Sequence, residues 1–252
     1  MRFLFFTLCI CLFSIPNVQA QISPPGLGET NSASWWAIGV KQKLDEKNTL
    51  TTYIGNGRIS GPEESDPYGY PSIWVMNAEL SHSLRKNWKY NAALSYRRQN
   101  EYEDTYNDPL FIKQEFRVYG RISHTMPLNR FKWTNTFREE VRKFYDAGFG
   151  AVANDWQLRT RIKTQLFYSL DHDNEHSLMA SAEALFSIAN DNTEGWDNPK
   201  YKEARFCFYY TFAPKNLDMT FDIGYMNNLI GTGNAVEDGS YVAVDIVIEN
   251  PF

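Results

Sequence analysis

Histidine spacing is the first test for catalysis in this sequence. A hydrolase site on a strand needs His and Ser two positions apart, because only then do imidazole and hydroxyl share a face and exchange a proton. None of the four histidines is followed by Ser at that spacing: His82, His124, His172 and His176. Zinc-protease, phosphate-loop, G-x-S-x-G and C-x-x-C motifs are also absent. We therefore expect neither enzyme activity nor a cofactor, and keep a lipid hydrolase or deacylase as the alternative.

Basic residues instead dominate one face of three consecutive segments between positions 110 and 170. Residues two positions apart share a face of a strand, so these side chains would form one basic wall. Its members are Lys113, Arg117, Arg121, Lys132, Arg138, Arg142, Arg159, Arg161 and Lys163. Glu115 and Glu140 are the acidic residues on the same face.

Acidic residues dominate the corresponding face farther along the chain. This predicted acidic wall consists of Glu183, Glu203, Asp218, Asp222 and Asp245. If both faces line the interior of a closed sheet, the basic wall lies opposite the acidic wall. Guanidinium groups stay charged at physiological pH, so the arginines need carboxylates, water or bound anions as partners.

Two interpretations of these walls stay open at this point. In the first, the walls meet as a hydrogen-bonded ion-pair network that fills a narrow interior. In the second, water remains and the field between the walls selects polar or anionic solutes, as rings of charge do in channels. Barrels of about eight strands are filled and barrels of about sixteen are open, so an intermediate size permits either.

Acidic residues also gather in five predicted loops that contain neither Lys nor Arg, near 60–71, 101–109, 145–155, 189–199 and 229–239. Carboxylate oxygens are ligands for Ca²⁺ and Mg²⁺, which could bridge these loops to the phosphates of a surface glycolipid. The candidate ligands are Glu63, Glu64, Asp66, Glu101, Glu103 and Asp104.

The segments that carry these residues alternate between apolar and polar side chains, which is the pattern of β-strands. In the segment 201–212, Phe206 and Phe208 share one face whereas Arg205 and Cys207 share the other. Eleven such runs lie near 34–44, 49–59, 72–84, 88–100, 110–126, 131–144, 155–170, 176–188, 201–212, 217–228 and 240–250. Turn-like connections alternate along the chain with the longer acidic loops, so the chain is a series of hairpins.

Strand length and loop asymmetry favour a membrane barrel over a soluble sandwich. The runs exceed the roughly five or six residues usual in soluble sheets, and short turns opposite long loops are typical of outer-membrane barrels. Trp74, Trp88 and Trp133 lie near run ends, where an interfacial girdle is expected. We predict an all-β fold, an antiparallel up-and-down transmembrane β-barrel of roughly 10–12 strands. A secreted β-sandwich binding module is a second alternative.

The strand count poses a problem for this prediction. A purely antiparallel barrel with both termini on one side has an even number of strands, whereas eleven runs are visible. Either residues 21–33 contribute an unrecognised strand or one of the runs is wrong.

The first twenty residues have the pattern of a secretory signal peptide. Arg2 precedes the apolar run 3–13, and Val18-Gln19-Ala20 forms a small-x-small cleavage site before Gln21. We predict cleavage after Ala20, a periplasmic or plug segment over 21–33, and one barrel domain over 34–252. After cleavage Cys207 is the remaining cysteine, so no internal disulfide is expected.

Composition and the chain terminus predict the location. A mean hydropathy of -0.47 excludes a bundle of membrane helices, and a net charge of -5 disfavours nucleic-acid binding. With the signal peptide, these features predict the outer membrane of a Gram-negative bacterium, with its lipid and glycolipid as partners. Phe252 resembles the terminal signal read by the outer-membrane assembly machinery, although Asn250 and Pro251 depart from the usual spacing.

The arginine-rich strands also carry a family resemblance. With FIKQEFRVYGRISH, WTNTFREEVRKF, WQLRTRIKTQLFYS and the terminal Phe252, the chain resembles domain-of-unknown-function family 2490 from about Trp35 onwards. The resemblance implies an outer-membrane barrel of the kind found in Bacteroidota-type bacteria. That family has no assigned activity, so it supplies no catalytic residues. We therefore predict a small barrel with a structural or passive-channel role.

Overall fold

The protein is described from a computed structural model that places residues 30–61, 64–85, 87–102, 109, 111–193, 195–232 and 235–252. The predicted signal peptide, residues 21–29 and the predicted ligands Glu63, Glu103 and Asp104 lie outside the described residues. Among the described residues, none belongs to a helix long and apolar enough to cross a membrane. The strands are β1 (Ser32–Lys43), β2 (Asn48–Ile59), β3 (Tyr70–Ser83), β4 (Trp88–Glu101), β5 (Phe111–Leu128), β6 (Phe131–Tyr145), β7 (Trp156–Ser169), β8 (His176–Asp191), β9 (Gly195–Trp196), β10 (Lys200–Phe212), β11 (Met219–Thr232) and β12 (Ala235–Glu249).

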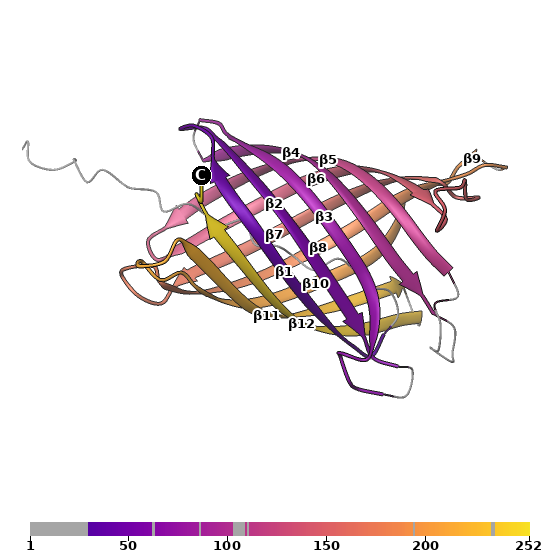
Figure 1. Ribbon diagram of the computed structural model, residues 1–252. Helices are drawn as coiled ribbons and strands as arrows, with labels where there is room; N and C mark the ends of the chain where they lie inside the picture. The colour runs from indigo at the N-terminus through magenta and orange to yellow at the C-terminus, as the bar shows by residue number, and fades with distance from the viewer. Residues whose placement is uncertain are drawn as a thin grey trace, which may run out of the picture.

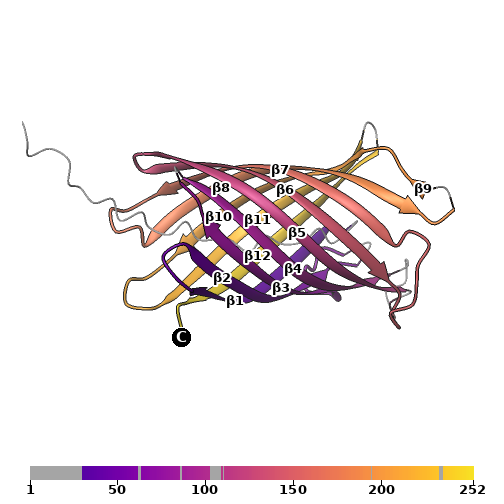
Figure 2. The same ribbon diagram turned by 90° about the horizontal axis from the view of Figure 1, so that it is seen from above.

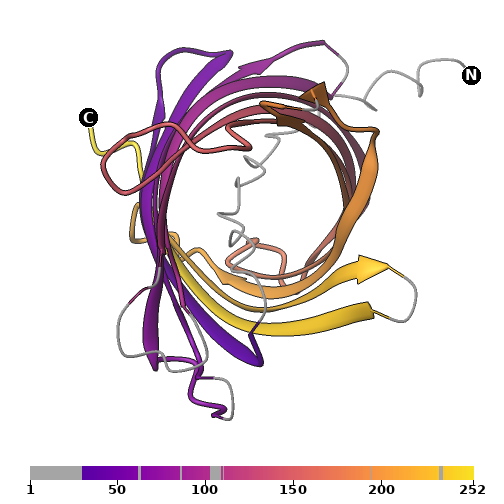
Figure 3. The same cartoon turned by 90° about the vertical axis from the view of Figure 1, so that its right-hand side faces the viewer.

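These strands form one sheet that closes on itself. Each strand pairs antiparallel with the next, except that the short β9 extends only the end of β8, and β10 pairs directly with β8. β1 and β12 pair in parallel, from Ser32 beside Ser240 to Lys41 beside Glu249. Figure 3 looks along the axis and shows the resulting ring. The prediction of an all-β barrel is confirmed, with eleven strands in the wall.

The parallel seam corrects the expectation of an even strand number. That expectation assumed antiparallel pairing throughout, whereas a parallel pair closes a barrel of eleven strands without a twelfth. As a consequence, β1 begins at the end of the barrel where β12 also begins. The chain therefore enters the wall at one end, through β1, and leaves it at the other, through β12.

The hairpin connections sort by length between the two ends of the barrel (Figure 1). At the end where β12 terminates, the turns are short, and Asn87, Asn129 and Asn174 adopt positive φ of 65°, 59° and 58°. Asparagine tolerates this left-handed conformation, which lets the strands reverse within a few residues. We call the other end the long-loop end. One predicted loop is wrong: 229–239 is mostly strand, because Leu229 pairs with Asp238 and Ile230 with Glu237.

The strand faces are sorted between the outside and the inside. All strands tilt relative to the long axis, as Figure 2 shows from above. Outward-facing side chains are large and apolar, and Leu94 and Val118 are 57% and 58% exposed. The inward faces carry most of the charged residues, so the usual arrangement of a soluble protein is inverted.

Part of the interior is an apolar and aromatic core. Trp35, Met226 and Tyr241 are fully buried inside the barrel. Tyr209 packs so closely on β11 that a Cβ added at Gly224 would lie 2.3 Å from its ring. Glycine at this position therefore leaves the space that the ring occupies.

Candidate functional site

The inward faces of β3 to β10 bring charged side chains together within the barrel. The strand register places like charges side by side, since Arg117 lies opposite Arg142 and Arg121 lies opposite Arg138. Like charges at directly opposite positions are destabilising. Their neighbours must therefore supply carboxylates.

Glu115 on β5 neutralises the first of these arginine pairs. Arg142 donates from Nε and Nη2 to the two carboxylate oxygens at 2.7 and 2.6 Å, a bidentate contact. Arg117 donates from Nε to the same carboxylate at 2.8 Å. Because Glu115 is only 2% exposed, these contacts compensate the cost of burying its charge.

Glu140 on β6 is a second centre of negative charge. Its Oε1 lies 2.7 Å from Arg138 Nε and 2.6 Å from Arg161 Nε. Arg117 Nε lies 3.4 Å away. The carboxylate is completely buried, and no described residue gives it an aligned hydrogen bond. Attraction between opposite charges is therefore what holds Glu140 among its arginines.

The ion pairs continue from Glu140 toward β10. Glu183 Oε2 lies 3.4 Å from Arg161 Nη1 and 3.9 Å from Arg205 Nη1. Arg205 then pairs with Glu203 at 2.5 Å, and Asn228 donates to the other oxygen of Glu203 at 2.9 Å. Both predicted acidic residues on β8 and β10 thus meet the arginines of β7 and β10.

The same network extends in the other direction to β3. Glu79 accepts hydrogen bonds from Tyr119 Oη at 2.9 Å and Asn91 Nδ2 at 2.7 Å, and it pairs with Arg121. The Arg138 guanidinium lies 3.4 Å from the centre of the Tyr119 ring, a cation–π contact. We call this connected set the luminal charge belt: Glu79, Glu115, Arg117, Arg121, Arg138, Glu140, Arg142, Arg161, Glu183, Glu203 and Arg205.

The belt corrects the prediction of a basic wall facing a separate acidic wall. Glutamates lie between the arginines on the same strands, because neighbouring carboxylates neutralise the charge at shorter range than a distant wall could. Asp218 lies in the exposed turn before β11. Asp222 and Asp245 face the apolar core, where Thr211 donates to Asp222 and Trp35 Nε1 donates to Asp245 at 3.0 Å.

The remaining members of the predicted basic wall lie at other inward positions. Lys113 and Lys132 lie over phenylalanine rings, with Nζ 4.7 Å from the centre of Phe144 and 5.1 Å from the centre of Phe167. Lys163 is paired in register with Glu183, and Arg159 is paired with Ser187. Basic side chains therefore outnumber carboxylates along the inner faces of β5 to β7.

A cavity of about 530 Å³ lies at the long-loop end, next to the Glu115 contacts. The floor of the cavity, on the side of the belt, is lined by Arg97, Glu115 and Arg142. Its rim, at the end of the barrel, is lined by Trp196 on β9. Phe144 and Lys113 form part of its wall. The cavity falls within the usual size range of small-molecule sites, roughly 300–1,000 Å³.

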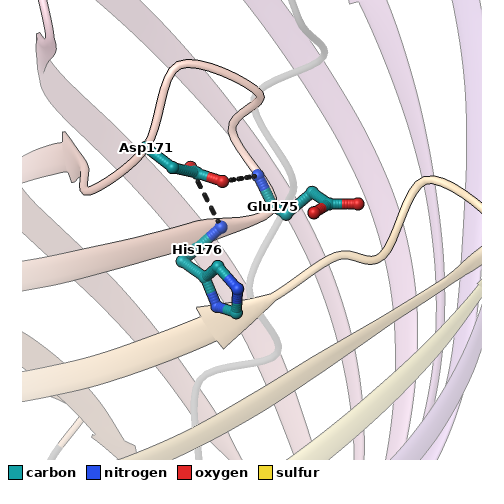
Figure 4. A group of neighbouring side chains, drawn as sticks. All are labelled: Asp171, Glu175 and His176. Atoms are coloured by element: carbon teal, nitrogen blue, oxygen red, sulfur yellow. Dashed lines mark hydrogen bonds between the residues drawn. The ribbon is translucent and has the colours of Figure 1, made fainter.

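At the opposite end of the barrel, the turn from β7 to β8 groups Asp171, Glu175 and His176 within 4.8 Å (Figure 4). The Asp171 carboxylate accepts the backbone N–H groups of Glu175 and His176, both at 3.2 Å. Desolvation raises the pKa of Asp171, but these hydrogen bonds outweigh it and place the pKa below its ordinary value. The grouping is therefore explained by the hydrogen bonds that close the turn.

The predicted loop ligands that the structure describes lie apart from this turn. Glu64 and Asp66 are exposed in the β2–β3 loop, and Asp66 accepts the backbone N–H of Tyr68 at 2.9 Å. Glu101 ends β4 and lines the cavity at the long-loop end. Among the described residues, these three do not form a group of possible metal ligands.

Sequence reasoning missed two components of the site. Glu79 was not assigned to an acidic wall, although it alternates with Asn77 and Ser81 on the polar face of its run. The aromatic part of the interior was also missed. Trp35 and Tyr209 are buried inside the barrel, at positions whose spacing assigns them to the otherwise polar face of their strands. The period-two pattern could have identified both.

Comparison with known proteins gives a family but no activity. The model of a family described as "Protein of unknown function (DUF2490)" matches residues 33–238, which confirms the resemblance inferred from the sequence. No curated protein matches the chain.

Proposed function

The chain belongs to the DUF2490 family of proteins of unknown function, and from this premise we propose that it is an outer-membrane barrel with a closed lumen and a structural role in the envelope. The luminal charge belt is the observation that carries this proposal. Its residues contact one another from β3 to β10, across most of the barrel wall. Most of these side chains are buried although they face the lumen, and from this we infer that they leave no continuous path for water or ions.

The aromatic core completes the closure that we propose. Trp35, Tyr209 and Tyr241 have no exposed surface, although all three point into the barrel. An open channel would leave such side chains in contact with water. The belt and the core together favour the filled-interior interpretation over the passive channel.

The outer surface supports placement in a membrane. The outward faces expose large apolar side chains around the barrel, far more than a soluble surface carries. Short turns at one end and longer loops at the other match outer-membrane barrels, and the predicted signal peptide agrees with export. We propose a Gram-negative outer membrane, with the short turns on the periplasmic side.

Two alternatives are less well supported. The closed single sheet excludes the two-sheet sandwich as the fold. For a lipid hydrolase, a histidine would have to contact a serine hydroxyl. His82 instead contacts Asn48 at 2.8 Å, His176 contacts Tyr210 at 2.6 Å, and the His124 ring lies against Trp88 with centroids 4.7 Å apart.

Reconstitution tests the proposed function. The purified chain should insert into phospholipid vesicles, show a heat-modifiable gel band, and give no osmotic swelling with small sugars. A sixteen-stranded porin serves as the positive control for swelling. Swelling comparable to that of the porin would refute the closed lumen, and recovery of the native protein from the soluble periplasm would refute the location.

A further inference from the structure

The cavity at the long-loop end has a floor of concentrated positive charge. Arg97 and Arg142 line the cavity together with Glu115. Both oxygens of Glu115 are already engaged by Arg142, and Arg117 shares one of them. One carboxylate therefore faces several cations, and the floor keeps a net positive charge.

Lys113 adds a further cation to the wall of the cavity. Its Nζ lies 4.7 Å from the centre of the Phe144 ring, and the Arg142 guanidinium lies 4.7 Å from the same ring. Within the described part of the chain, no carboxylate forms an ion pair with Lys113. Arg142 already donates to Glu115 and Gln157, so Lys113 is the donor for an anion beside this ring and Arg142 adds positive charge next to it.

The upper wall carries groups suited to a hydroxylated molecule. Gln99, Asn154 and Gln157 supply amides, and Asp191 supplies a carboxylate. Trp196 is 54% exposed at the rim, so solvent reaches this end of the cavity. Glu101, Asp197 and Lys202 also line the cavity, so its acidic and basic side chains are equal in number and the excess of positive charge is confined to the floor. Asp197 is paired with Lys200 at 2.9 Å, which reduces its repulsion of an anion.

From this arrangement we propose that the cavity binds a monosaccharide carrying a phosphate or a carboxylate. The anionic group contacts Lys113 on the wall and lies beside Arg97 and Arg142 at the floor, while the hydroxyls contact the amides and Asp191 above. The volume of about 530 Å³ accommodates a ligand of that size. This site is separate from the closed lumen, because it lies on the long-loop side of the belt.

Calorimetric titration of the full chain in detergent micelles tests the proposal. Glucose 6-phosphate and glucuronate are the two anionic probes, and glucose is the neutral one. Binding of either anion but not of glucose is the expected result, and the stronger of the two anions identifies the preferred group. Absence of binding by both anions at millimolar concentration, or equal binding of glucose, would overturn the proposal.

Two lysines provide a matched pair of variants. Lys113→Gln should weaken binding of the anion by about tenfold or more, because a charge-assisted contact is lost. Lys132→Gln is the control, since Lys132 also lies inside the barrel over a phenylalanine ring but near the short-turn end. Lys202→Gln should also weaken binding of the anion, because it removes a cation from the cavity lining, and it changes an exposed residue rather than a buried one. A folded Lys113→Gln protein with unchanged affinity, or equal losses for Lys113→Gln and Lys132→Gln, would contradict the assignment.

Discussion

Glu139 and Glu140 are adjacent on β6 and point to opposite sides of the barrel wall. Glu140 is buried among Arg117, Arg138 and Arg161, whereas Glu139 is exposed on the outer face and accepts a hydrogen bond from Thr160 at 2.8 Å. The two residues have the same chemistry and different surroundings. They therefore separate the effect of the belt from the effect of losing a negative charge.

Glu140→Gln should lower the free energy of unfolding by about 3–5 kcal/mol, because it leaves buried arginines without their carboxylate. Glu139→Gln should leave the stability unchanged or slightly higher, since it removes a charge from the apolar outer surface. Urea unfolding of the vesicle-inserted protein, followed by tryptophan fluorescence, measures both. Equal shifts for the two variants would show that the belt does not stabilise the barrel.

Replacing Asp245 should not lower the free energy of unfolding, in contrast to replacing Glu140. Asp245 is paired in register with Asp222, and no described cation forms an ion pair with either residue. Asp245→Asn keeps an oxygen for the Trp35 indole and removes repulsion between the two carboxylates. We expect stability to stay the same or rise by up to about 1 kcal/mol in the same unfolding assay. A loss as large as that of Glu140→Gln would mean that Asp245 neutralises a cation.

At the scale of the strands, Gly224 on β11 provides the space for the Tyr209 ring of β10. Gly224→Ala should lower the free energy of unfolding by about 1–3 kcal/mol, because the new methyl overlaps the base of a buried ring. Gly120→Ala is the control, since its nearest neighbour is the Tyr90 hydroxyl at 3.3 Å, at the flexible end of a side chain. If both variants unfold at the same urea concentration as the wild type, the ring does not pack as described.

The sequence predicted the strands and the direction of their side chains, but it did not predict which strands contact one another. Alternation identified the runs and the face of Arg117 or Glu203, because a strand's side-chain direction repeats every two residues. It could not identify Glu183 as a second neighbour of Arg205, because that contact depends on the register of β8 against β10. The prediction of two separate walls failed for the same reason. Glu79 and Arg121 come together because β4 pairs with both β3 and β5, and the sequence does not show this pairing.

For the molecule as a whole, the parallel seam between β1 and β12 can be tested by cross-linking. In a chain whose three cysteines are replaced by alanine, Ser32→Cys with Ser240→Cys should form a disulfide, because these positions are paired. Ser32→Cys with Ile248→Cys should not, since eight residues of strand separate the sites by roughly 26 Å. An antiparallel seam would give the reverse result on a non-reducing gel.

We propose that the luminal charge belt and the aromatic core together close the barrel. Planar-bilayer recording of the inserted wild-type protein distinguishes a closed barrel from an open one, with the same preparation verified by its heat-modifiable gel band. We expect insertion without unitary current steps across the applied voltage range. Long-lived steps of uniform size in the wild-type protein would contradict it, because a continuous water path cannot coexist with a filled interior.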